Sequence, residues 1–238
     1  MKIGIFAYNF KHWKTQQGIL NLMLAGKKPD IIFAADKVKL NFYQSQIRTS
    51  PKDLYLHHPR DIAKHYNIDY KVVVHNSEQV AALVKERQLD LGIILGARIL
   101  KPISFKNFKI GVLNMHPGLL PENRGLDNIK WAIVDNLAQG VTTHLIDEKI
   151  DKGLLLHKEQ INIYKDDTLL DLQLRVQHLE QKLMLRSINT LEKNSNLELK
   201  KLGVGTYNKP MSPEVEETLL DLFEEYKKKN NCENNSTQ

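Results

Sequence analysis

The residues best suited to chemistry are Asn114 and His116, two positions apart in the segment GVLNMHPGLLP, residues 111–121. The residues before them are mostly apolar, which predicts a strand over residues 110–115. Because side chains alternate across a strand, we expect Asn114 and His116 on one face and Met115 on the other. An asparagine amide can donate a hydrogen bond to a developing oxyanion. A histidine can exchange a proton near neutral pH or, when charged, stabilise the same oxyanion. The pair indicates acyl transfer, although both side chains could instead cap backbone groups of the following loop.

A second polar segment, HLIDEKIDKG, covers residues 144–153 and leads from a predicted strand into a loop. The loop carries three carboxylates: Asp147, Glu148 and Asp151. A carboxylate that approaches a histidine can fix its tautomer and raise its pKa. The spacing alone does not say which of the three carboxylates would do so.

Short apolar runs alternate with helical patterns before and after these two segments. The runs predict strands over residues 2–7, 31–35, 72–74, 91–95, 110–115, 141–146 and 154–163. A helix is expected over residues 77–88, with Asn76 as its cap and Gln79 as the capping-box partner. This alternation predicts an α/β fold with a mostly parallel sheet flanked by helices. Open sheets of this kind bind ligands at the carboxyl ends of their strands, where Asn114 and His116 stand.

A long helix is expected over residues 167–192, because apolar residues recur there at spacings of three and four. Its apolar stripe, expected to pack against the sheet, consists of Leu169, Leu172, Val176, Leu179 and Leu183.

The pattern changes after residue 197, and the chain is predicted to end in a small strand-helix appendage. Ser212 and Pro213 are typical of a helix start, and acidic residues precede basic ones along that helix, as its dipole favours. The apolar face of this terminal helix comprises Val215, Leu219, Leu222, Phe223 and Tyr226. The predicted organisation is therefore a catalytic domain over residues 1–196, an appendage over 197–229 and a disordered tail over 230–238. Packing, substrate closure and dimerisation all stay open as roles of the appendage, and a homodimer is a plausible assembly.

Composition narrows the class of protein. The chain has 238 residues, 42% of them hydrophobic, and Cys232 is its single cysteine, so an intrachain disulfide and a thiolate metal cluster are excluded. It shows no signal peptide and no bilayer-spanning stretch, which favours a cytoplasmic protein without a membrane partner. The net charge of +6 suits an anionic partner, or it reflects solvated surface lysines. No zinc signature, triphosphate-binding loop or groove-shaped basic helix is present, so neither a metal nor nucleic acid is expected.

Three blocks of sequence together resemble the core signature of the formyltransferase family: LGARILKP, LNMHPGLLPENRG and GVTTHLIDEKIDKG. That family includes glycinamide ribonucleotide formyltransferase, methionyl-tRNA formyltransferase and the sugar N-formyltransferases. The resemblance covers roughly residues 90–165, and more loosely residues 1–190. It implies a Rossmann-like domain that transfers a formyl group from 10-formyltetrahydrofolate to a primary amine.

Matched residue by residue, Asn114 and His116 correspond to the family's catalytic asparagine and histidine, and Asp151 to its catalytic aspartate. The family often has a glycine where this chain has Lys152. The resemblance also places the pteridine of the reduced folate around a strand end and a loop, mostly on backbone groups. The residues implied in cofactor binding are Arg98, Ile99, Leu100, Ile146, Asp147 and Glu148, with Thr142 and His144 lining the neighbouring strand.

The acceptor amine is harder to predict. Enzymes that formylate glycinamide ribonucleotide hold its phosphate with a loop rich in glycine and serine after the first strand. Here the corresponding segment, AYNFKHWKTQQG over residues 7–18, has no glycine before Gly18. Its aromatic, basic and amide side chains could stack on a base and pair with a pyrophosphate. The residues predicted to bind this substrate are Asn9, Lys11, His12, Trp13 and Lys14.

A loop after the histidine motif is predicted to contact the sugar through Arg124, Asn128 and Trp131. For all of these residues, solvated surface charge or core packing is the alternative. The segment after residue 197 is too short for the C-terminal barrel of methionyl-tRNA formyltransferases. The resemblance therefore favours a sugar N-formyltransferase for a nucleotide-linked amino sugar, such as a dTDP-4-amino-4,6-dideoxyhexose, in the synthesis of surface polysaccharide, O-antigen or lipopolysaccharide. The alternatives are another small amine, such as glycinamide ribonucleotide, hydrolysis of 10-formyltetrahydrofolate, or a binding protein that kept the fold.

Overall fold

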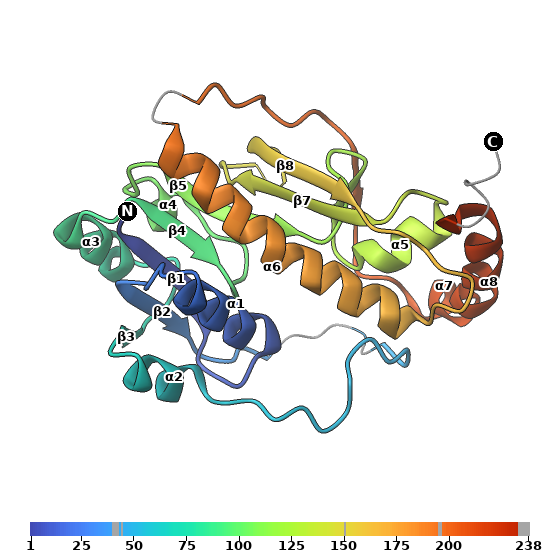
Figure 1. Ribbon diagram of the computed structural model, residues 1–238, viewed down its shortest axis with the longest axis horizontal. Helices are drawn as coiled ribbons and strands as arrows, with labels where there is room; N and C mark the ends of the chain where they lie inside the picture. Colours follow the sequence, from blue (N-terminus) through green and yellow to red (C-terminus); the bar gives the residue numbers. More distant parts are fainter. Residues whose placement is uncertain (40–42, 44, 150, 195–196, 233–238) are drawn as a thin grey trace.

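A computed structural model of the protein describes residues 1–39, 43, 45–149, 151–194 and 197–232. Its centre is a seven-stranded sheet with the strand order β3-β2-β1-β4-β5-β7-β8 (Figure 1). The strands are β1 (Ile3–Tyr8), β2 (Ile31–Ala35), β3 (Asp69–Val72), β4 (Leu91–Ile94), β5 (Gly111–His116), β7 (Gly140–Leu145) and β8 (Leu154–Gln160). The first five are parallel, whereas β7 is antiparallel to both β5 and β8. The predicted α/β fold with a mostly parallel sheet is confirmed.

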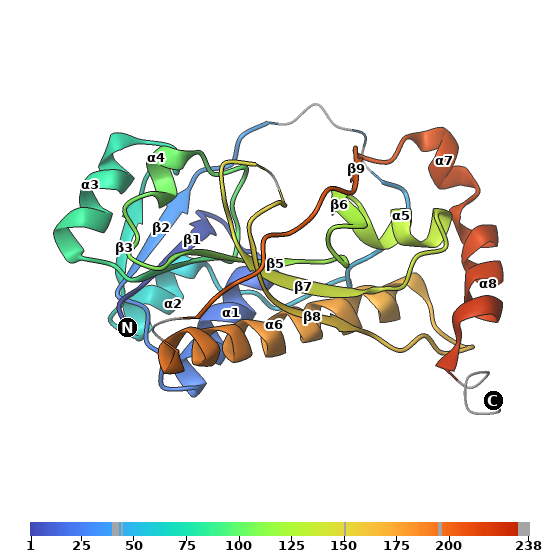
Figure 2. The same ribbon diagram turned by 90° about the horizontal axis from the view of Figure 1, so that it is seen from above.

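Helices cover both faces of this sheet (Figure 2). One face carries α1 (Trp13–Leu24), α2 (Pro59–His65) and α6 (Leu169–Lys193). The other face carries α3 (Glu78–Arg87) and α4 (Pro102–Phe105). Alternate residues of β1 enter the two cores, because Ile5 faces α1 and Phe6 faces α3.

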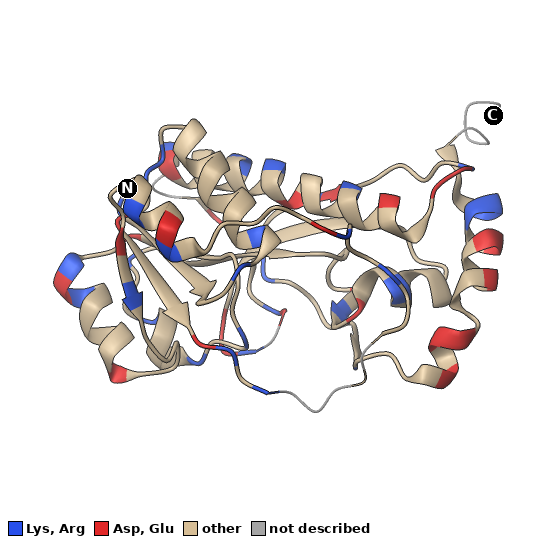
Figure 3. Ribbon diagram, turned by 90° about the horizontal axis from the view of Figure 1, so that it is seen from below, with Lys and Arg blue, Asp and Glu red and all other residues tan. Residues whose placement is uncertain are grey.

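A second group of elements packs around the N-terminal half of α6. It contains α5 (Asn128–Val134), α7 (Pro213–Glu217), α8 (Leu219–Asn230) and a two-stranded parallel sheet of β6 (Asn123–Gly125) and β9 (Thr206–Asn208). The α6 stripe is buried as predicted, but it packs on α5 and α8 as well as on Val141 of β7. Acidic residues lie in α7 and early α8 and lysines in the last turn of α8 (Figure 3), which complements the helix dipole.

Several predicted boundaries were wrong. The third strand spans Asp69–Val72 rather than residues 72–74, because its pairing with β2 ends at Val72 and Val74 is exposed. Ser77, not Asn76, caps α3: its hydroxyl accepts a hydrogen bond from the Val80 amide. The Asn76 side chain instead accepts hydrogen bonds from the Lys101 amide and the Ser104 hydroxyl, so it ties α3 to α4.

The first helix and the C-terminal region also differ from expectation. The segment from Trp13 onward, which the sequence places in a substrate-binding loop, is helical. No side chain caps the first turn of this helix, so the sequence carries no signal for its start. The terminal helix is divided at Thr218 into α7 and α8. The expected tail begins too early, because α8 continues to Asn230 and Asn231 is buried. The rest of that tail, residues 233–238, lies outside the described residues.

No helix within the described residues is long and apolar enough to cross a membrane.

Candidate functional site

Asn114 and His116 lie on one face of β5, as the alternation predicts. Met115 points the other way, into the core beneath α1 and α6, and is 1% exposed. The antiparallel partner strand β7 places His144 opposite Asn114 and Thr142 opposite His116. The Asn114 amide nitrogen lies 3.2 Å from Nε2 of His144. The pair therefore shares its face of the sheet with the two β7 residues.

His116 is buried, with 4% of its surface exposed. Its Nε2 donates to the main-chain oxygen of Asn123, 2.8 Å away, and because a carbonyl only accepts, this nitrogen carries a proton. Its Nδ1 lies 3.5 Å from Oδ1 of Asp151. The other oxygen of Asp151 accepts a hydrogen bond from the Gly125 amide at 3.0 Å. A second proton on the ring would therefore sit at Nδ1, facing the carboxylate.

Burial and neighbouring charge act in opposite directions on the two histidines. Burial lowers the pKa of His116 below its usual value, whereas the charge of Asp151 raises it. Burial, together with the charge of His116, lowers the pKa of His144 to about 4. His144 is therefore neutral near pH 7, and its Nε2 can accept a hydrogen bond from Asn114. Of the two rings, only His116 has its second nitrogen facing the nearby Asp151 carboxylate at 3.5 Å.

The short strand β6 holds both halves of this contact. The main chain of Asn123 binds His116, and the amide of Gly125 binds Asp151. Gly125 has φ +97°, and a Cβ there would lie 2.1 Å from the Asn208 carbonyl oxygen of β9. Only glycine fits this close approach of two backbones. Sequence reasoning missed Asn123 and Gly125, although both stand in the block LPENRG that carries part of the resemblance.

The residues predicted to bind the folate lie on two neighbouring loops, after β4 and after β7. Leu100 and Ile146 pack in the same cluster with α3 and α4. Ile99 is 63% exposed and Val38 is 58% exposed, while Arg98 donates a hydrogen bond to the Val38 carbonyl. Apolar side chains open to solvent beside main-chain polar groups suit a flat heterocycle, so the residues present fit a pteridine.

The two acidic residues of the second loop face the surface. Glu148 forms an ion pair of 3.1 Å with Lys106, and Asp147 accepts a hydrogen bond from the Lys149 amide. Of the three carboxylates that the sequence left open, Asp151 is the one beside His116. Within the described residues, no group of three or more His, Cys, Asp or Glu side chains could hold a metal ion.

The predicted substrate residues after β1 do not converge on one place. The Asn9 side chain donates to Asp36 at 2.6 Å and accepts from Tyr70 at 2.7 Å, so it is held beside β2 and β3. His12 lies 2.9 Å from the Thr15 hydroxyl. Burial, followed by the charge of Lys14, lowers the pKa of His12 to about 4. Lys11 is exposed to solvent.

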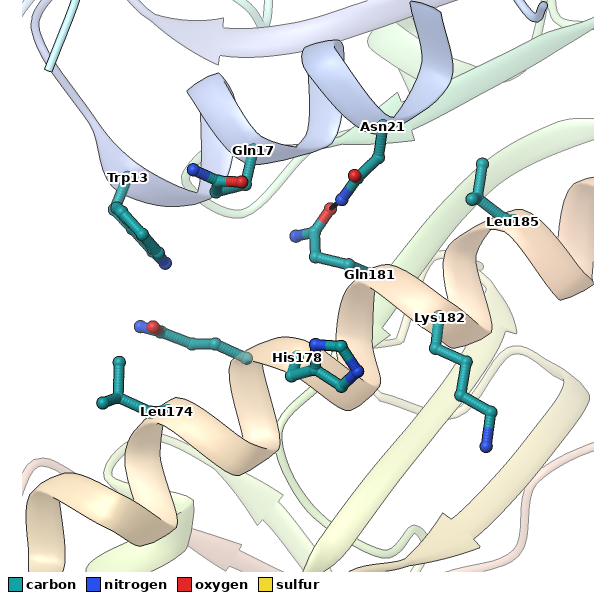
Figure 4. A pocket seen from close by; sticks show the side chains of 9 residues that line it. Trp13, Gln17, Asn21, Leu174, His178, Gln181, Lys182 and Leu185 are labelled. Carbon is teal, nitrogen blue, oxygen red and sulfur yellow. Dashed lines mark hydrogen bonds between the residues drawn. The ribbon is translucent and has the colours of Figure 1, made fainter. Parts of the chain in front are cut away.

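Trp13 and Lys14 belong to α1, and both side chains lie at its contact with α6. Trp13 lines a surface groove of about 570 Å³ between α1 and α6 (Figure 4). The other residues of this groove are Gln17, Asn21, Leu174, Gln177, His178, Gln181, Lys182 and Leu185. The groove lies on the side of the sheet that carries α1 and α6, whereas Asn114 and His116 face the opposite side. Lys14 forms an ion pair of 2.7 Å with Glu180 of α6.

The three residues predicted to contact a sugar do not lie in a loop. Arg124 belongs to β6, and Asn128 and Trp131 belong to α5. The residue before α5, Asp127, has a left-handed backbone conformation with φ 50°. Asn128 is buried and donates to the Asn123 main-chain oxygen, the group that also binds His116.

Arg124 and Trp131 both contact the C-terminal segment. The Arg124 guanidinium donates to the Gly205 carbonyl at 3.2 Å and lies over the ring of Tyr207. The Trp131 indole donates to the Lys209 carbonyl at 2.8 Å. Both side chains therefore join the β6–α5 region to the segment around β9.

Comparison with known proteins identifies a protein family for this chain. The family model described as formyl transferase matches residues 32–188, more than half of the chain. The matched part includes the Asn114–His116 pair and the loop with Asp151.

The individual relatives are named as different kinds of formyltransferase. A methionyl-tRNA formyltransferase from Chlorobium limicola is 36% identical over 93 residues, which are 39% of this chain and 29% of the relative. A GDP-perosamine N-formyltransferase from Brucella melitensis is 34% identical over 104 residues, 43% of this chain and 40% of the relative. The chain thus spans less than half the length of these curated relatives. Glycinamide ribonucleotide transformylase 1 from Symbiobacterium toebii shares the fold, with a TM-score of 0.62 and 18% identity over 85% of this chain and 94% of that one.

Proposed function

Because the chain belongs to the formyl transferase family, we propose that it transfers a formyl group from 10-formyltetrahydrofolate to a primary amine. The observation that carries this proposal is the buried contact between Nδ1 of His116 and Asp151, 3.5 Å apart, beside Asn114. Formyl transfer needs a donor for a developing oxyanion and a group that accepts the amine proton. Asn114 and His116 supply both functions from one face of β5.

The proposed roles follow from the hydrogen bonds. 10-Formyltetrahydrofolate supplies an activated formyl carbon to the amine. An asparagine amide has two N–H donors, so Asn114 can keep its contact with His144 and still donate to the formyl oxygen. His116 keeps its Nε2 proton on the Asn123 carbonyl. At Nδ1 it would take the proton that the attacking amine loses and return it to the departing nitrogen of tetrahydrofolate. Asp151 stabilises the charged ring, and β6 fixes the positions of both.

For the acceptor, we propose a nucleotide-linked amino sugar, such as a dTDP-4-amino-4,6-dideoxyhexose for surface polysaccharide. The turn after β1 supports this choice, because residues 9–12 contain no glycine to cradle a phosphate with backbone amides. The GDP-perosamine N-formyltransferase among the relatives also supports it. A second candidate, glycinamide ribonucleotide, is favoured by the shared fold with its transformylase.

We further propose that residues 1–196 form the catalytic domain and residues 197–229 its appendage. A homodimer through the appendage is also proposed, since Leu220 is 58% and Leu222 is 37% exposed on α8. Sedimentation of the wild-type protein and of Leu220→Lys tests it, because a monomer in both cases would contradict the dimer.

One experiment tests the donor and the acceptor together. The protein is incubated with 10-formyltetrahydrofolate and, in separate reactions, with dTDP- and UDP-linked amino sugars, glycinamide ribonucleotide or no acceptor. The expected result is a formylated sugar, absent with Asn114→Ala. Formylation of glycinamide ribonucleotide alone would overturn the sugar acceptor, and formate release without an acceptor would identify a hydrolase instead.

A further inference from the structure

Two ion pairs link α6 to the first helical region, one to Lys14 of α1 and one to Lys27 in the segment after α1. Near the catalytic end of the sheet, Lys14 lies 2.7 Å from Glu180. At the other end, Lys27 lies 2.5 Å from Glu192. The two glutamates differ in burial, because the Glu180 side chain is 4% exposed and that of Glu192 is 34% exposed. A buried carboxylate requires a partner far more than an exposed one does.

Lys14 has a second partner that connects this ion pair to the site. Its ammonium donates a hydrogen bond of 3.1 Å to the main-chain oxygen of Met115. Met115 is the residue between Asn114 and His116, and its carbonyl belongs to the peptide unit that links it to His116. The Lys27–Glu192 pair, by contrast, lies beyond the end of α1, at the opposite end of the helix contact.

We propose that Lys14 and Glu180 are positioning residues for the Asn114–His116 pair. Glu180 of α6 fixes the ammonium of Lys14, and Lys14 fixes the Met115 carbonyl at the end of β5. Helices α1 and α6, on one side of the sheet, thereby position the Asn114 and His116 side chains on the other side. This proposal rests on the proposed formyl transfer as the reaction of the site. The effect of Lys14 and Glu180 on His116 can nevertheless be measured without a formyl-transfer assay.

This role differs from the substrate contact that the sequence predicts for Lys14. The ammonium already serves two acceptors of the protein, the Glu180 carboxylate and the Met115 carbonyl. A substrate phosphate would have to displace the nearly buried Glu180 and leave its charge without a partner. The two roles predict different kinetics, because a positioning residue acts on kcat and a substrate contact acts on KM.

The ion pair also contributes to the electrostatic surroundings of His116. The charged and titratable groups that act on its ring are Asp151 from the loop after β7, His144 on β7, Glu180 on α6 and Lys14 on α1. Burial lowers the pKa of His116, Asp151 and Glu180 raise it, and Lys14 lowers it. Neutralising Glu180 alone leaves the charge of Lys14 uncompensated, whereas neutralising both residues removes the two opposing effects.

The first test follows the His116 ring directly by nitrogen-15 NMR titration of the full-length protein. Glu180→Gln is expected to lower the titration midpoint of His116 by about half a pH unit. The double variant Lys14→Gln/Glu180→Gln is expected to return most of the way to the wild-type midpoint. Glu192→Gln, which removes the matching charge at the outer end of the same helices, is the control and leaves the midpoint unchanged. A folded Glu180→Gln protein with the wild-type midpoint would overturn the proposal.

The second test uses formyl transfer to whichever amine of the panel the wild-type protein accepts. Lys14→Gln and Glu180→Gln are each expected to lower kcat about tenfold, with KM for donor and acceptor within about twofold of wild type. Lys14→Arg, which keeps the charge, is expected to recover most of the lost kcat. An increase of acceptor KM at unchanged kcat in Lys14→Gln would make Lys14 a substrate contact instead. If no amine is formylated, the proposed function fails, while the titration of His116 still tests whether the Lys14–Glu180 pair acts on the ring of His116.

Discussion

The cluster around His116 and the cluster around Glu216 are both buried, but their charged groups are paired differently. Glu216 of α7 is 5% exposed and accepts hydrogen bonds from Lys130 at 2.5 Å, from the Tyr43 hydroxyl at 3.0 Å and from the Gln46 amide at 2.9 Å. The Ser45 hydroxyl donates to it as well. This clasp ties the segment between β2 and α2 to α5 and α7.

In the cluster around His116, the corresponding contacts are longer. Asp151 lies 3.5 Å from His116 and 3.9 Å from His144. Groups at these separations keep hydrogen-bonding capacity that a ligand can use, whereas the carboxylate of Glu216 has little left. This difference agrees with the proposal that the first cluster serves binding and chemistry, whereas the second holds elements of the fold together. Substitutions in the two clusters should therefore affect different quantities.

The largest effect is expected from His116→Asn. Asparagine cannot take up and release the amine proton, so kcat should fall about 1,000-fold. The measurement is formyl transfer under saturating donor and acceptor. His178→Asn, which changes an exposed histidine on α6, should stay within about twofold of wild type. A loss of less than tenfold in His116→Asn would contradict the assignment of the chemistry to this cluster.

Glu216→Gln is expected to act on stability instead. Burial raises the pKa of Glu216, but hydrogen bonds from Lys130, Ser45 and others outweigh it and lower the pKa from 4.5 to about 2. A carboxylate with a lowered pKa stabilises the fold fully above its unfolded value, and this contribution is lost as the pH falls from about 4.5 towards 2. Urea unfolding at pH 7 should show a loss on the order of 3 kcal/mol.

The matched control for this clasp is Glu217→Gln, at the exposed neighbouring position. It should change the free energy of unfolding by less than about 0.5 kcal/mol. Equal losses in the two variants would mean that the clasp is not the source of the effect.

A third effect concerns His144 in the cluster around His116 and the stability of the protein at acid pH. His144 has a folded-state pKa of about 4 against an ordinary value of 6.5, so it is lowered and the unfolded chain binds the proton more readily. Stability is therefore lost as the pH falls from 6.5 to 4, by about 1.4 kcal/mol per pH unit from this residue. His144→Asn should make the pH dependence of unfolding shallower by that amount. His65→Asn, an exposed control on α2, should leave the slope as it is.

The smallest effect is expected outside both clusters, at Lys11. This exposed side chain can attract an anionic acceptor but takes no part in a buried contact. Lys11→Ala should raise acceptor KM about threefold at low salt, leave kcat unchanged and lose its effect at high salt. Lys85→Ala on α3 is the control for the lost charge. A change in kcat would extend the catalytic region to the turn after β1.

How far the sequence predicts the molecule depends on the range of the interactions involved. The common face of Asn114 and His116 was predicted because strand alternation is a local property. The cap of α3 was wrong by one residue because Asn76 and Ser77 are both good caps, and only the contact of Asn76 with Lys101 decides between them. The start of α1 was missed because no side chain caps it, and its His12 backbone is extended.

Spacing along the chain could not predict most side-chain contacts between distant residues. Lys130 and Glu216 are typical surface charges in sequence, yet they meet across 86 positions and are buried. Strands β6 and β9 are three residues long, which is too short for a recognisable alternation of apolar and polar residues. Each is a strand only because it pairs with the other. The choice of Asp151 came from the resemblance, and the structure adds the Gly125 amide that holds it. The catalytic and ligand-binding roles of these residues stay predictions until they are measured.

The pairing of β6 with β9 has a consequence for the order of folding. The central sheet is complete once residues up to 160 have been synthesised, but the strand that braces Asn123 and Gly125 consists of Thr206–Asn208. A nascent or refolding chain can therefore acquire its core before β9 arrives to support the contact of His116 with Asp151. Recovery of activity during refolding should lag behind recovery of secondary structure. A strand that is synthesised after the whole of the central sheet would then determine when the proposed site becomes active.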